Sequence, residues 1–124
     1  MPLEKTYHDF CDDAREHVGE VDVAELKASL QSDTPPLLVD VREPDETSMG
    51  TIPGAVVIPR GVLERDIAGA FGGRISDEDL ERPLVVYCAG GSRSLLAART
   101  LKEMGFTQPV SLRGGFRAWI VSSC

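Results

Sequence analysis

Short apolar runs alternate with longer amphipathic segments along the chain. Four of these runs, at residues 37–41, 56–58, 84–87 and 110–112, are rich in the β-branched and aliphatic residues that favour strands. The clearest is residues 84–87, four apolar residues that follow Pro83. We therefore predict a short strand at each of the four positions.

The segments between these runs carry helical signals. Residues 93–104 place apolar side chains at helical spacing and are followed by Gly105, a typical C-terminal stop. Asp22 and Glu25 form a capping-box pattern that opens a helix ending near residue 30. Shorter helical segments are predicted at residues 62–70, 76–80 and 116–120, with one helical turn beginning at Pro44.

This alternation predicts an α/β fold with a single domain: a mostly parallel sheet of about five short strands, with helices on both faces. We assign residues 22–124 to this domain. Residues 1–21 form an acidic N-terminal extension whose apolar residues are spaced for a short helix. Ligands in such sheets bind at the carboxyl ends of the strands, so the loop after residues 84–87 is the candidate site.

The composition limits the possible functions. The chain has 124 residues and a net charge of −7, which disfavours nucleic acid as a partner because phosphate backbones attract clustered Lys and Arg. No apolar run approaches the ~18 residues of a membrane span, and the N-terminus lacks a secretory signal. We expect a cytoplasmic protein without a membrane partner. The three cysteines are too few and too scattered for a disulfide framework.

Charge is spread unevenly along the chain. From Arg82 to the C-terminus there are six basic residues and one acidic residue, a net charge of +5, so residues 1–81 carry −12. A locally positive region attracts anions even in an acidic protein. We therefore expect the C-terminal part to attract a small anion.

The segment from Cys88 to Arg93, here called the Cys88 loop, has the chemistry of an anion-binding loop. It enters a predicted helix, whose first backbone N–H groups lack partners and whose dipole is positive at this end. Gly90 and Gly91 let the loop curl until several N–H groups converge, and Arg93 adds planar donors suited to an oxyanion. A thiol at the base of this cup ionises easily, which makes Cys88 the candidate nucleophile.

An inert, packed thiol is the alternative, since free cysteine is among the most buried residue types. The conjunction of a strand, Cys88, two glycines, Arg93 and a helix favours an active site instead. A thiolate in this position attacks sulfur by the chemistry of disulfide exchange. The negative persulfide that results is held by the same N–H groups.

Four segments resemble the rhodanese family of single-domain thiosulfate sulfurtransferases: residues 38–46 (LVDVREPDE), 50–55 (GTIPGA), 86–94 (VYCAGGSRS) and 112–119 (LRGGFRAW). They occur in the family's order and spacing, and together they are highly specific. The resemblance implies a transferase that moves sulfane sulfur from a donor such as thiosulfate to cyanide or a thiol, with Cys88 as the catalytic persulfide carrier. The substrate-binding residues that it implies are Ala89, Gly90, Gly91, Ser92 and Arg93.

The partners implied by the resemblance are a small sulfur-containing anion or thiol, namely thiosulfate, cyanide, glutathione or a thioredoxin-like acceptor. No cofactor is implied. His8, Cys11 and His17 match no compact zinc pattern and lack a fourth ligand, so no metal site is predicted. We interpret Cys124 as an unreactive terminal thiol rather than as a resolving partner of Cys88.

Three charged residues, Asp40, Arg42 and Glu46, are predicted to support the site. Asp40 and Arg42 follow a strand at the same edge of the sheet, and we expect them to pair with each other or with the Cys88 loop. Glu46 is expected to reach Arg93 or the loop backbone. A purely structural ion-pair network is the alternative for all three, and it is the interpretation that we favour.

The length of the loop separates two activities. Four residues lie between Cys88 and Arg93 (C-x4-R), whereas the related dual-specificity phosphatases have C-x5-R, and the tighter ring fits one sulfur atom better than a tetrahedral phosphate. Ala89 is uncharged where some relatives carry Arg or Lys, which weakens the expected preference for a doubly charged donor. Two alternatives to a sulfurtransferase stay open besides a phosphatase: a non-catalytic or relay module that docks a partner protein, and a redox sensor.

Overall fold

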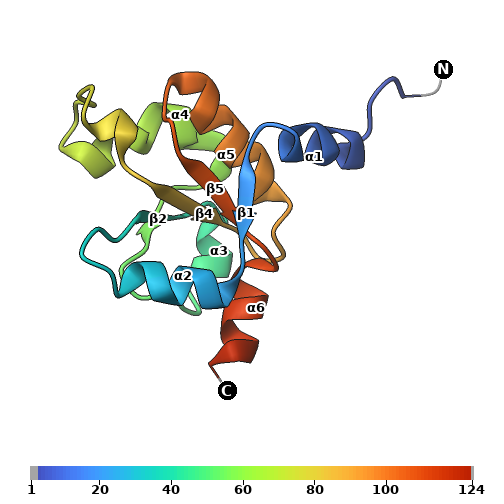
Figure 1. Cartoon of the computed structure of the whole chain (residues 1–124). Coiled ribbons are helices and arrows are strands. Elements are labelled where there is room, and N and C mark those ends of the chain that lie inside the picture. The colour runs from blue at the N-terminus through green and yellow to red at the C-terminus, as the bar shows by residue number, and fades with distance from the viewer. Residues whose placement is uncertain (1–2, 124) are drawn as a thin grey trace.

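A five-stranded sheet lies at the centre of the computed structural model, which describes residues 3–123 (Figure 1). The strands are β1 (Gly19–Val21), β2 (Leu37–Asp40), β3 (Val56–Val57), β4 (Leu84–Tyr87) and β5 (Pro109–Leu112). They lie in the order β1-β5-β4-β2-β3, and every neighbouring pair is parallel. The predicted parallel sheet of about five short strands is confirmed.

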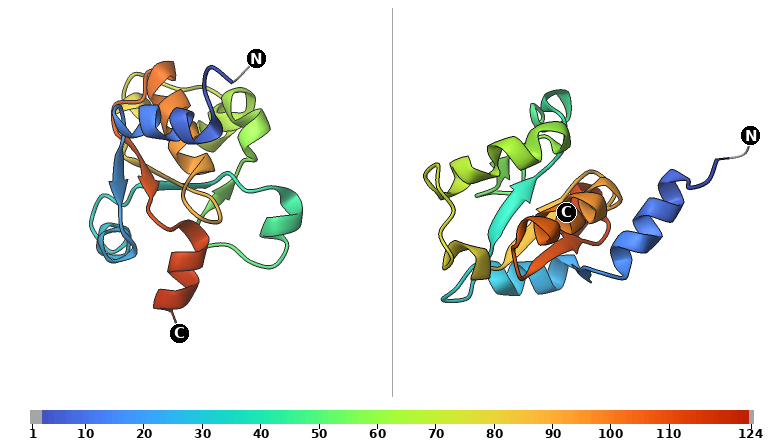
Figure 2. Two further views of the ribbon diagram at one scale, coloured as in Figure 1. Left: turned by 90° about the vertical axis from the view of Figure 1, so that its right-hand side faces the viewer. Right: turned by 90° about the horizontal axis from the view of Figure 1, so that it is seen from above.

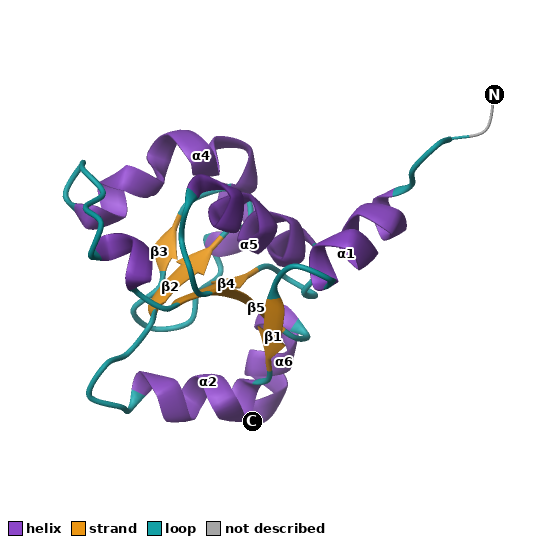
Figure 3. Ribbon diagram, turned by 45° about the horizontal axis from the view of Figure 1, so that its top comes forward, coloured by secondary structure: helices purple, strands orange, loops and turns teal. Residues whose placement is uncertain are grey.

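Helices cover both faces of the sheet, which confirms the predicted α/β layers. The helices are α1 (Tyr7–Arg15), α2 (Val23–Leu30), α3 (Pro44–Thr47), α4 (Leu63–Asp66), α5 (Arg93–Met104) and α6 (Gly115–Ser122), with 3-10 turns η1 (Arg60–Val62), η2 (Ile67–Phe71) and η3 (Asp79–Glu81). Helices α1, α4 and α5 lie on one face, and α2 and α6 lie on the other (Figure 3). Helix α3 lies in the connection between β2 and β3.

Alternation along β4 divides the core into two layers. Leu84, Val86 and Cys88 pack in the layer that includes residues of α1 and α5, whereas Val85 and Tyr87 pack in the layer that includes residues of α2 and α6. Successive side chains of a strand point to opposite faces of a sheet. This period places the Cys88 side chain on the α5 face.

Two helices begin and end where the sequence predicts. At the start of α2, Asp22 Oδ1 accepts from the Glu25 N–H at 2.8 Å, and Glu25 Oε1 accepts from the Asp22 N–H at 3.1 Å. Helix α5 spans the predicted residues and is followed by Gly105, whose φ of 120° ends the helix. The helix that follows the Cys88 loop is therefore correctly placed by sequence signals alone.

Three stretches of local structure differ from the sequence prediction. Residues 19–21 carry no strand in that prediction, but they form β1, which pairs with β5 from Gly19 opposite Val110 to Val21 opposite Leu112. Three residues are too few to show a period of two, and it is the hydrogen-bonding edge of β5 that makes them a strand. The helix predicted at residues 62–70 is divided into η1, α4 and η2, because Gly61 and Gly69 lower helix propensity at both ends.

The short helix predicted at residues 76–80 is also wrong in its position. The segment instead forms η3 at residues 79–81. Ser76 and Asp79 cap each other, with the Ser76 N–H donating to Asp79 Oδ2 at 2.9 Å and the Asp79 N–H donating to Ser76 Oγ at 3.1 Å. Ser76 thus caps the segment, and its carbonyl accepts the first helical hydrogen bond, from the Leu80 N–H at 3.3 Å, while the 3-10 residues begin at Asp79.

Helix α1 packs across α5, on the face of the sheet that carries Cys88 (Figure 2). Its Cys11 and Ala14 are buried in the same layer as Leu95 and Ala98 of α5. The N-terminal extension thus adds a helix to the α5 face and, through β1, a strand to the sheet. Within residues 3–123, no helix is long and apolar enough to cross a membrane.

Candidate functional site

The Cys88 loop joins β4 to α5 at the carboxyl end of the sheet. The backbone N–H of Gly91 donates a hydrogen bond to Cys88 Sγ at 3.1 Å. Gly91 has a φ of 103°, in the region that side-chain-bearing residues rarely adopt. This conformation turns the loop back on the thiol, so that a donor points at the sulfur atom.

The hydrogen bonds around Cys88 lower the pKa of its thiol below the ordinary value. Burial works in the opposite direction and raises this pKa, but it is outweighed by hydrogen bonds from the Ser94 hydroxyl and from the backbone N–H groups of Ser94, Gly91 and Gly90. All of these donors stabilise the thiolate. The thiolate is the nucleophilic form of cysteine, so the loop favours the reactive state.

The start of α6 explains why the N–H groups of the loop face inward. The Phe116 N–H donates to the Cys88 carbonyl at 2.8 Å, and the Arg117 N–H donates to the Ala89 carbonyl at 3.1 Å. With these two carbonyls bonded to α6, the following N–H groups are left to point toward the thiol. Gly115 allows this close approach, because a methyl group placed there lies 2.7 Å from the Ala89 carbonyl oxygen and closer still to that of Cys88.

Two buried serines complete the surroundings of the thiol. Ser94 Oγ lies 3.4 Å from Cys88 Sγ and 2.8 Å from Ser111 Oγ. Ser111 Oγ also lies 3.5 Å from the Gly91 carbonyl oxygen, and its single proton goes to Ser94 Oγ when the Ser94 proton faces the thiolate. Sequence analysis did not single out either residue. The signal present for Ser94 is a polar residue on the apolar face of a helix, next to the candidate nucleophile.

Arg93 points its guanidinium at Glu46. It donates two hydrogen bonds to the carboxylate, at 2.8 Å and 2.9 Å. These bonds lower the pKa of Glu46 to about 2, and the bond to Glu46 raises the pKa of Arg93. Glu46 lies in α3, so the pair ties the β2–β3 connection to the first residue of α5.

Asp40 and Arg42 form a second, fully buried pair. Arg42 Nη2 donates to Asp40 Oδ2 at 2.8 Å, and a further bond joins the same Nη2 to the Gly50 carbonyl at 2.8 Å. Burial works against the charge of Arg42, but the hydrogen bonds and the charge of Asp40 outweigh it and raise the pKa of Arg42. The pair therefore holds the β2–β3 connection, which carries Glu46, and has no direct bond to the Cys88 loop.

The thiol itself is covered. Cys88 is 1% exposed, while Gly90 is exposed at the surface of the loop. Helix α1 reaches the same place: Cys11 Sγ lies 3.9 Å from the Ser92 carbonyl. Burial raises the pKa of the Tyr7 phenol, and negative charge on Cys11 and on Cys88 adds to that rise. The N-terminal helix is thus part of the electrostatic surroundings of Cys88.

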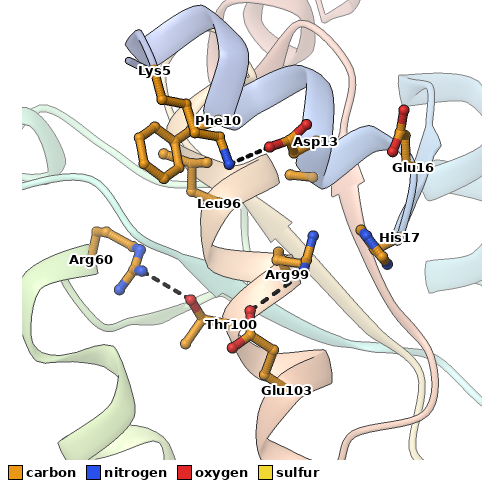
Figure 4. Close-up of a pocket in the computed structure, with 11 residues that line it drawn as sticks. Lys5, Phe10, Asp13, Glu16, His17, Arg60, Leu96, Arg99, Thr100 and Glu103 are labelled. Carbon is orange, nitrogen blue, oxygen red and sulfur yellow. Dashed lines mark hydrogen bonds and ion pairs between the residues drawn. The ribbon is translucent and has the colours of Figure 1, made fainter. Parts of the chain in front are cut away.

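A separate groove lies between α1, η1 and α5 (Figure 4). Phe10 and Leu96 line it, but no residue of the Cys88 loop does. Its Lys5, Arg60 and Arg99 are each paired with a carboxylate. The groove therefore presents no unpaired arginine or lysine to an anion, and it is distinct from the candidate site.

His8, Cys11 and His17, weighed above as metal ligands, do not form a metal-binding group. Among residues 3–123, no group of three or more His, Cys, Asp and Glu side chains is arranged to hold a metal ion. His8 pairs with Asp12 at 3.1 Å. Cys124 lies outside the described residues.

Known proteins resemble this chain in sequence and in structure. A family model described as rhodanese-like domain matches residues 22–122. A sulfurtransferase from Allochromatium vinosum is 34% identical over 102 residues, which cover 82% of this chain and 88% of that protein. The human single-domain sulfurtransferase TSTD1 matches with a TM-score of 0.71 and 30% identity, over 84% of this chain and 96% of that one.

A third similar protein extends the match to the N-terminal segment. A Rhodopseudomonas palustris protein of unknown function, described as a possible tyrosine phosphatase, matches with a TM-score of 0.81 and 32% identity. The match covers 99% of this chain and 95% of that one. Helix α1 and β1 precede the residues that the family model matches, but they fall within the part of this chain that the match with this solved structure covers.

Proposed function

This chain belongs to the rhodanese-like domain family, and on that basis we propose that it is a sulfurtransferase that carries sulfur as a persulfide on Cys88. A donor such as thiosulfate loads the sulfur, and cyanide or a thiol removes it. The sulfurtransferases among its relatives support the general activity. The residues of the chain itself support the mechanism.

The observation that carries this proposal is the direction of the hydrogen bonds around Cys88 Sγ. Backbone N–H groups and the Ser94 hydroxyl point at the sulfur and lower the pKa of the thiol, although burial alone raises it. The same donors suit the outer sulfur of a persulfide, which carries one negative charge. An inert core cysteine has no need of several hydrogen bonds to its sulfur.

The reaction proceeds in two displacements. First, the Cys88 thiolate attacks the outer sulfur of thiosulfate; a new S–S bond forms, the bond to the sulfite group breaks, and sulfite leaves with the electron pair. The product, Cys88–S–S⁻, keeps the negative charge that the thiolate had. Second, cyanide or a thiolate attacks the outer sulfur, and the Cys88 thiolate leaves unchanged.

Intact mass spectrometry tests the proposal. After incubation with thiosulfate, we expect the chain to gain the mass of one sulfur atom and to lose it again on addition of cyanide or dithiothreitol. The variant Cys88→Ser is expected to gain nothing. Cys11→Ala is the matched control, since it removes the other described thiol and leaves Cys88 in place; it is expected to load like the natural chain. Loading that persists in Cys88→Ser refutes the proposal.

The same preparation distinguishes the alternatives. A phosphatase, suggested by the description of the Rhodopseudomonas palustris structure, hydrolyses an aryl phosphate and takes up no sulfur. A docking module does neither. Because four residues separate Cys88 from Arg93, we expect no turnover of the aryl phosphate.

A further inference from the structure

The cations of the C-terminal part differ in whether they are already paired. Arg93 is bound to Glu46 and Arg99 to Glu103, and Lys102 donates to the His17 carbonyl. Within residues 3–123, the remaining three basic residues of this part form no ion pair; they are Arg82, Arg113 and Arg117. Three unpaired guanidinium groups in this part of the chain are therefore available to bind an anionic ligand.

Of these three, Arg117 lies against the Cys88 loop. Its backbone N–H is bound to the Ala89 carbonyl at 3.1 Å. Its guanidinium folds back along the loop, because a methyl group placed on Gly90 lies 3.3 Å from Nη1 of Arg117. Both Arg117 and Gly90 are exposed. A free cation thus stands at the exposed part of a loop whose inner N–H groups face the thiol.

The charged residues Arg93 and Glu46, which also lie near the loop, do not provide an unpaired guanidinium group as Arg117 does. Arg93 and Glu46 together bring no net charge, and two donors of Arg93 are occupied by the carboxylate. Ala89 brings no charge either. An oxyanion that approaches Cys88 loses hydrogen bonds to water. The planar donors of Arg117 are unoccupied and can replace them, because their spacing matches that of oxyanion oxygens.

We propose that Arg117 is a specificity-determining residue that binds the oxyanion group of the sulfur donor at the exposed side of the Cys88 loop. This inference rests on the proposed function and names the contact that selects the donor. The guanidinium holds the sulfite group of a donor such as thiosulfate while its outer sulfur meets the Cys88 thiolate. The sulfite group carries negative charge on its oxygens both before and after the S–S bond breaks, so Arg117 acts on binding more than on the bond exchange.

The test is a comparison of KM and kcat with cyanide as the acceptor. We expect Arg117→Ala to raise KM for thiosulfate about tenfold, the size of one lost charged hydrogen bond, with kcat kept within about twofold. Arg117→Lys keeps the charge without the planar donors and is expected to raise KM less. With methanethiosulfonate, a donor that carries one negative charge less, the effect of Arg117→Ala on KM is expected to be smaller.

Arg82→Ala is the charge-matched control. Arg82 is exposed and precedes β4, at the opposite end of the strand from Cys88, so its loss changes the net charge equally without touching the site; KM is expected to stay the same. An unchanged KM in Arg117→Ala overturns the inference, as does an equal rise in Arg82→Ala or in Arg113→Ala, which means that diffuse charge is enough. A natural chain that takes no sulfur at all overturns the proposed function, and this inference with it.

Discussion

The guanidinium of Arg93 donates two hydrogen bonds to the carboxylate of Glu46, at 2.8 Å and 2.9 Å, across 47 positions of the sequence. Arg93 is the first residue of α5, and Glu46 lies in the short helix α3. The pair therefore joins the end of the Cys88 loop to the β2–β3 connection. It is partly exposed, with side-chain exposures of 35% for Arg93 and 30% for Glu46.

The variant Glu46→Gln tests how this pair depends on pH. Arg93 holds the pKa of Glu46 at about 2 in the folded chain, below its ordinary 4.5, so the pair stabilises the fold fully above pH ~5 and loses this contribution as the pH falls toward 2. We expect Glu46→Gln to be less stable than the natural chain by about 1 kcal/mol at neutral pH, as for a partly exposed pair, and the difference to shrink in acid. Urea unfolding of both chains at neutral pH and at acid pH measures this difference in the free energy of unfolding.

Glu103→Gln serves as the control for that comparison. Glu103 pairs with Arg99 but is 66% exposed, and such pairs contribute little. We expect its free energy of unfolding to match that of the natural chain at both pH values. A Glu46→Gln difference that is equally large in acid contradicts the assignment to the ionised carboxylate.

The buried pair of Asp40 and Arg42 predicts a larger loss. Asp40 has a side-chain exposure of 0% and Arg42 of 5%, so Asp40→Asn leaves the Arg42 charge buried without its partner, which costs about 3–5 kcal/mol. Asp66→Asn breaks an exposed aspartate–arginine pair, with Arg65, and is expected to change stability little. Urea unfolding of both variants measures the contrast. Equal losses mean that burial does not set the contribution of the Asp40 pair.

Sequence reasoning reached the strand, the thiol and the helix because each has a local signal. The apolar residues of β4, the two glycines and the periodicity of α5 lie within about twenty consecutive positions. It also named Glu46 as a partner for Arg93, but only beside a second possibility. The choice depended on how α3 is placed against α5, which no local pattern of residues specifies.

Sequence analysis missed the roles of the two buried serines and of Arg117, because their contacts depend on how separate segments are arranged in the fold. Ser111 reaches Ser94 because β5 lies beside β4 in the sheet, and strand order is a property of the whole fold. Arg117 reaches Gly90 because the start of α6 is bound to the Cys88 and Ala89 carbonyls. These contacts join segments that are separate in the sequence.

The two neighbouring glycines of the Cys88 loop are predicted to respond differently to substitution by alanine. A methyl group on Gly91 lies 3.1 Å from the Gly114 backbone nitrogen and 3.3 Å from the Leu112 carbonyl oxygen, and Gly91 has a φ of 103°. We expect Gly91→Ala to cost about 2–4 kcal/mol of stability and to slow sulfur loading, because the Gly91 N–H turns away from Cys88.

Gly90→Ala is the matched substitution one residue earlier. Its methyl group meets only the end of the flexible Arg117 side chain, so we expect a loss of stability below about 1 kcal/mol. Displacement of the guanidinium is expected to raise KM for thiosulfate, and this rise should be absent when Gly90→Ala is added to Arg117→Ala. Unfolding and steady-state kinetics measure the two effects. Equal losses of stability in the two glycine variants contradict the geometry of the loop.

The hydroxyl of Ser94 is predicted to set part of the acidity of Cys88. It lies 3.4 Å from Sγ and lowers the pKa of the thiol against the effect of burial. Ser94→Ala removes this bond and leaves the backbone N–H groups of Gly90, Gly91 and Ser94 in place. We expect the pKa of Cys88 to rise, so that the pH at which the thiol reacts half-maximally with iodoacetamide moves upward. Mass spectrometry of the peptide that carries Cys88 follows the reaction.

Ser111→Ala separates this effect from a general loosening of the core. Ser111 Oγ lies 2.8 Å from Ser94 Oγ and has no bond to the sulfur, so both variants lose one bond of the same buried pair and each is expected to lose about 1 kcal/mol of stability. The shift in reactivity should nevertheless be clearly larger for Ser94→Ala, because only that variant takes a donor from the thiolate. If the two shifts are equal, the serine pair acts on Cys88 as a unit; if neither variant shifts, the backbone N–H groups alone hold the thiolate, and Ser94 has only a packing role.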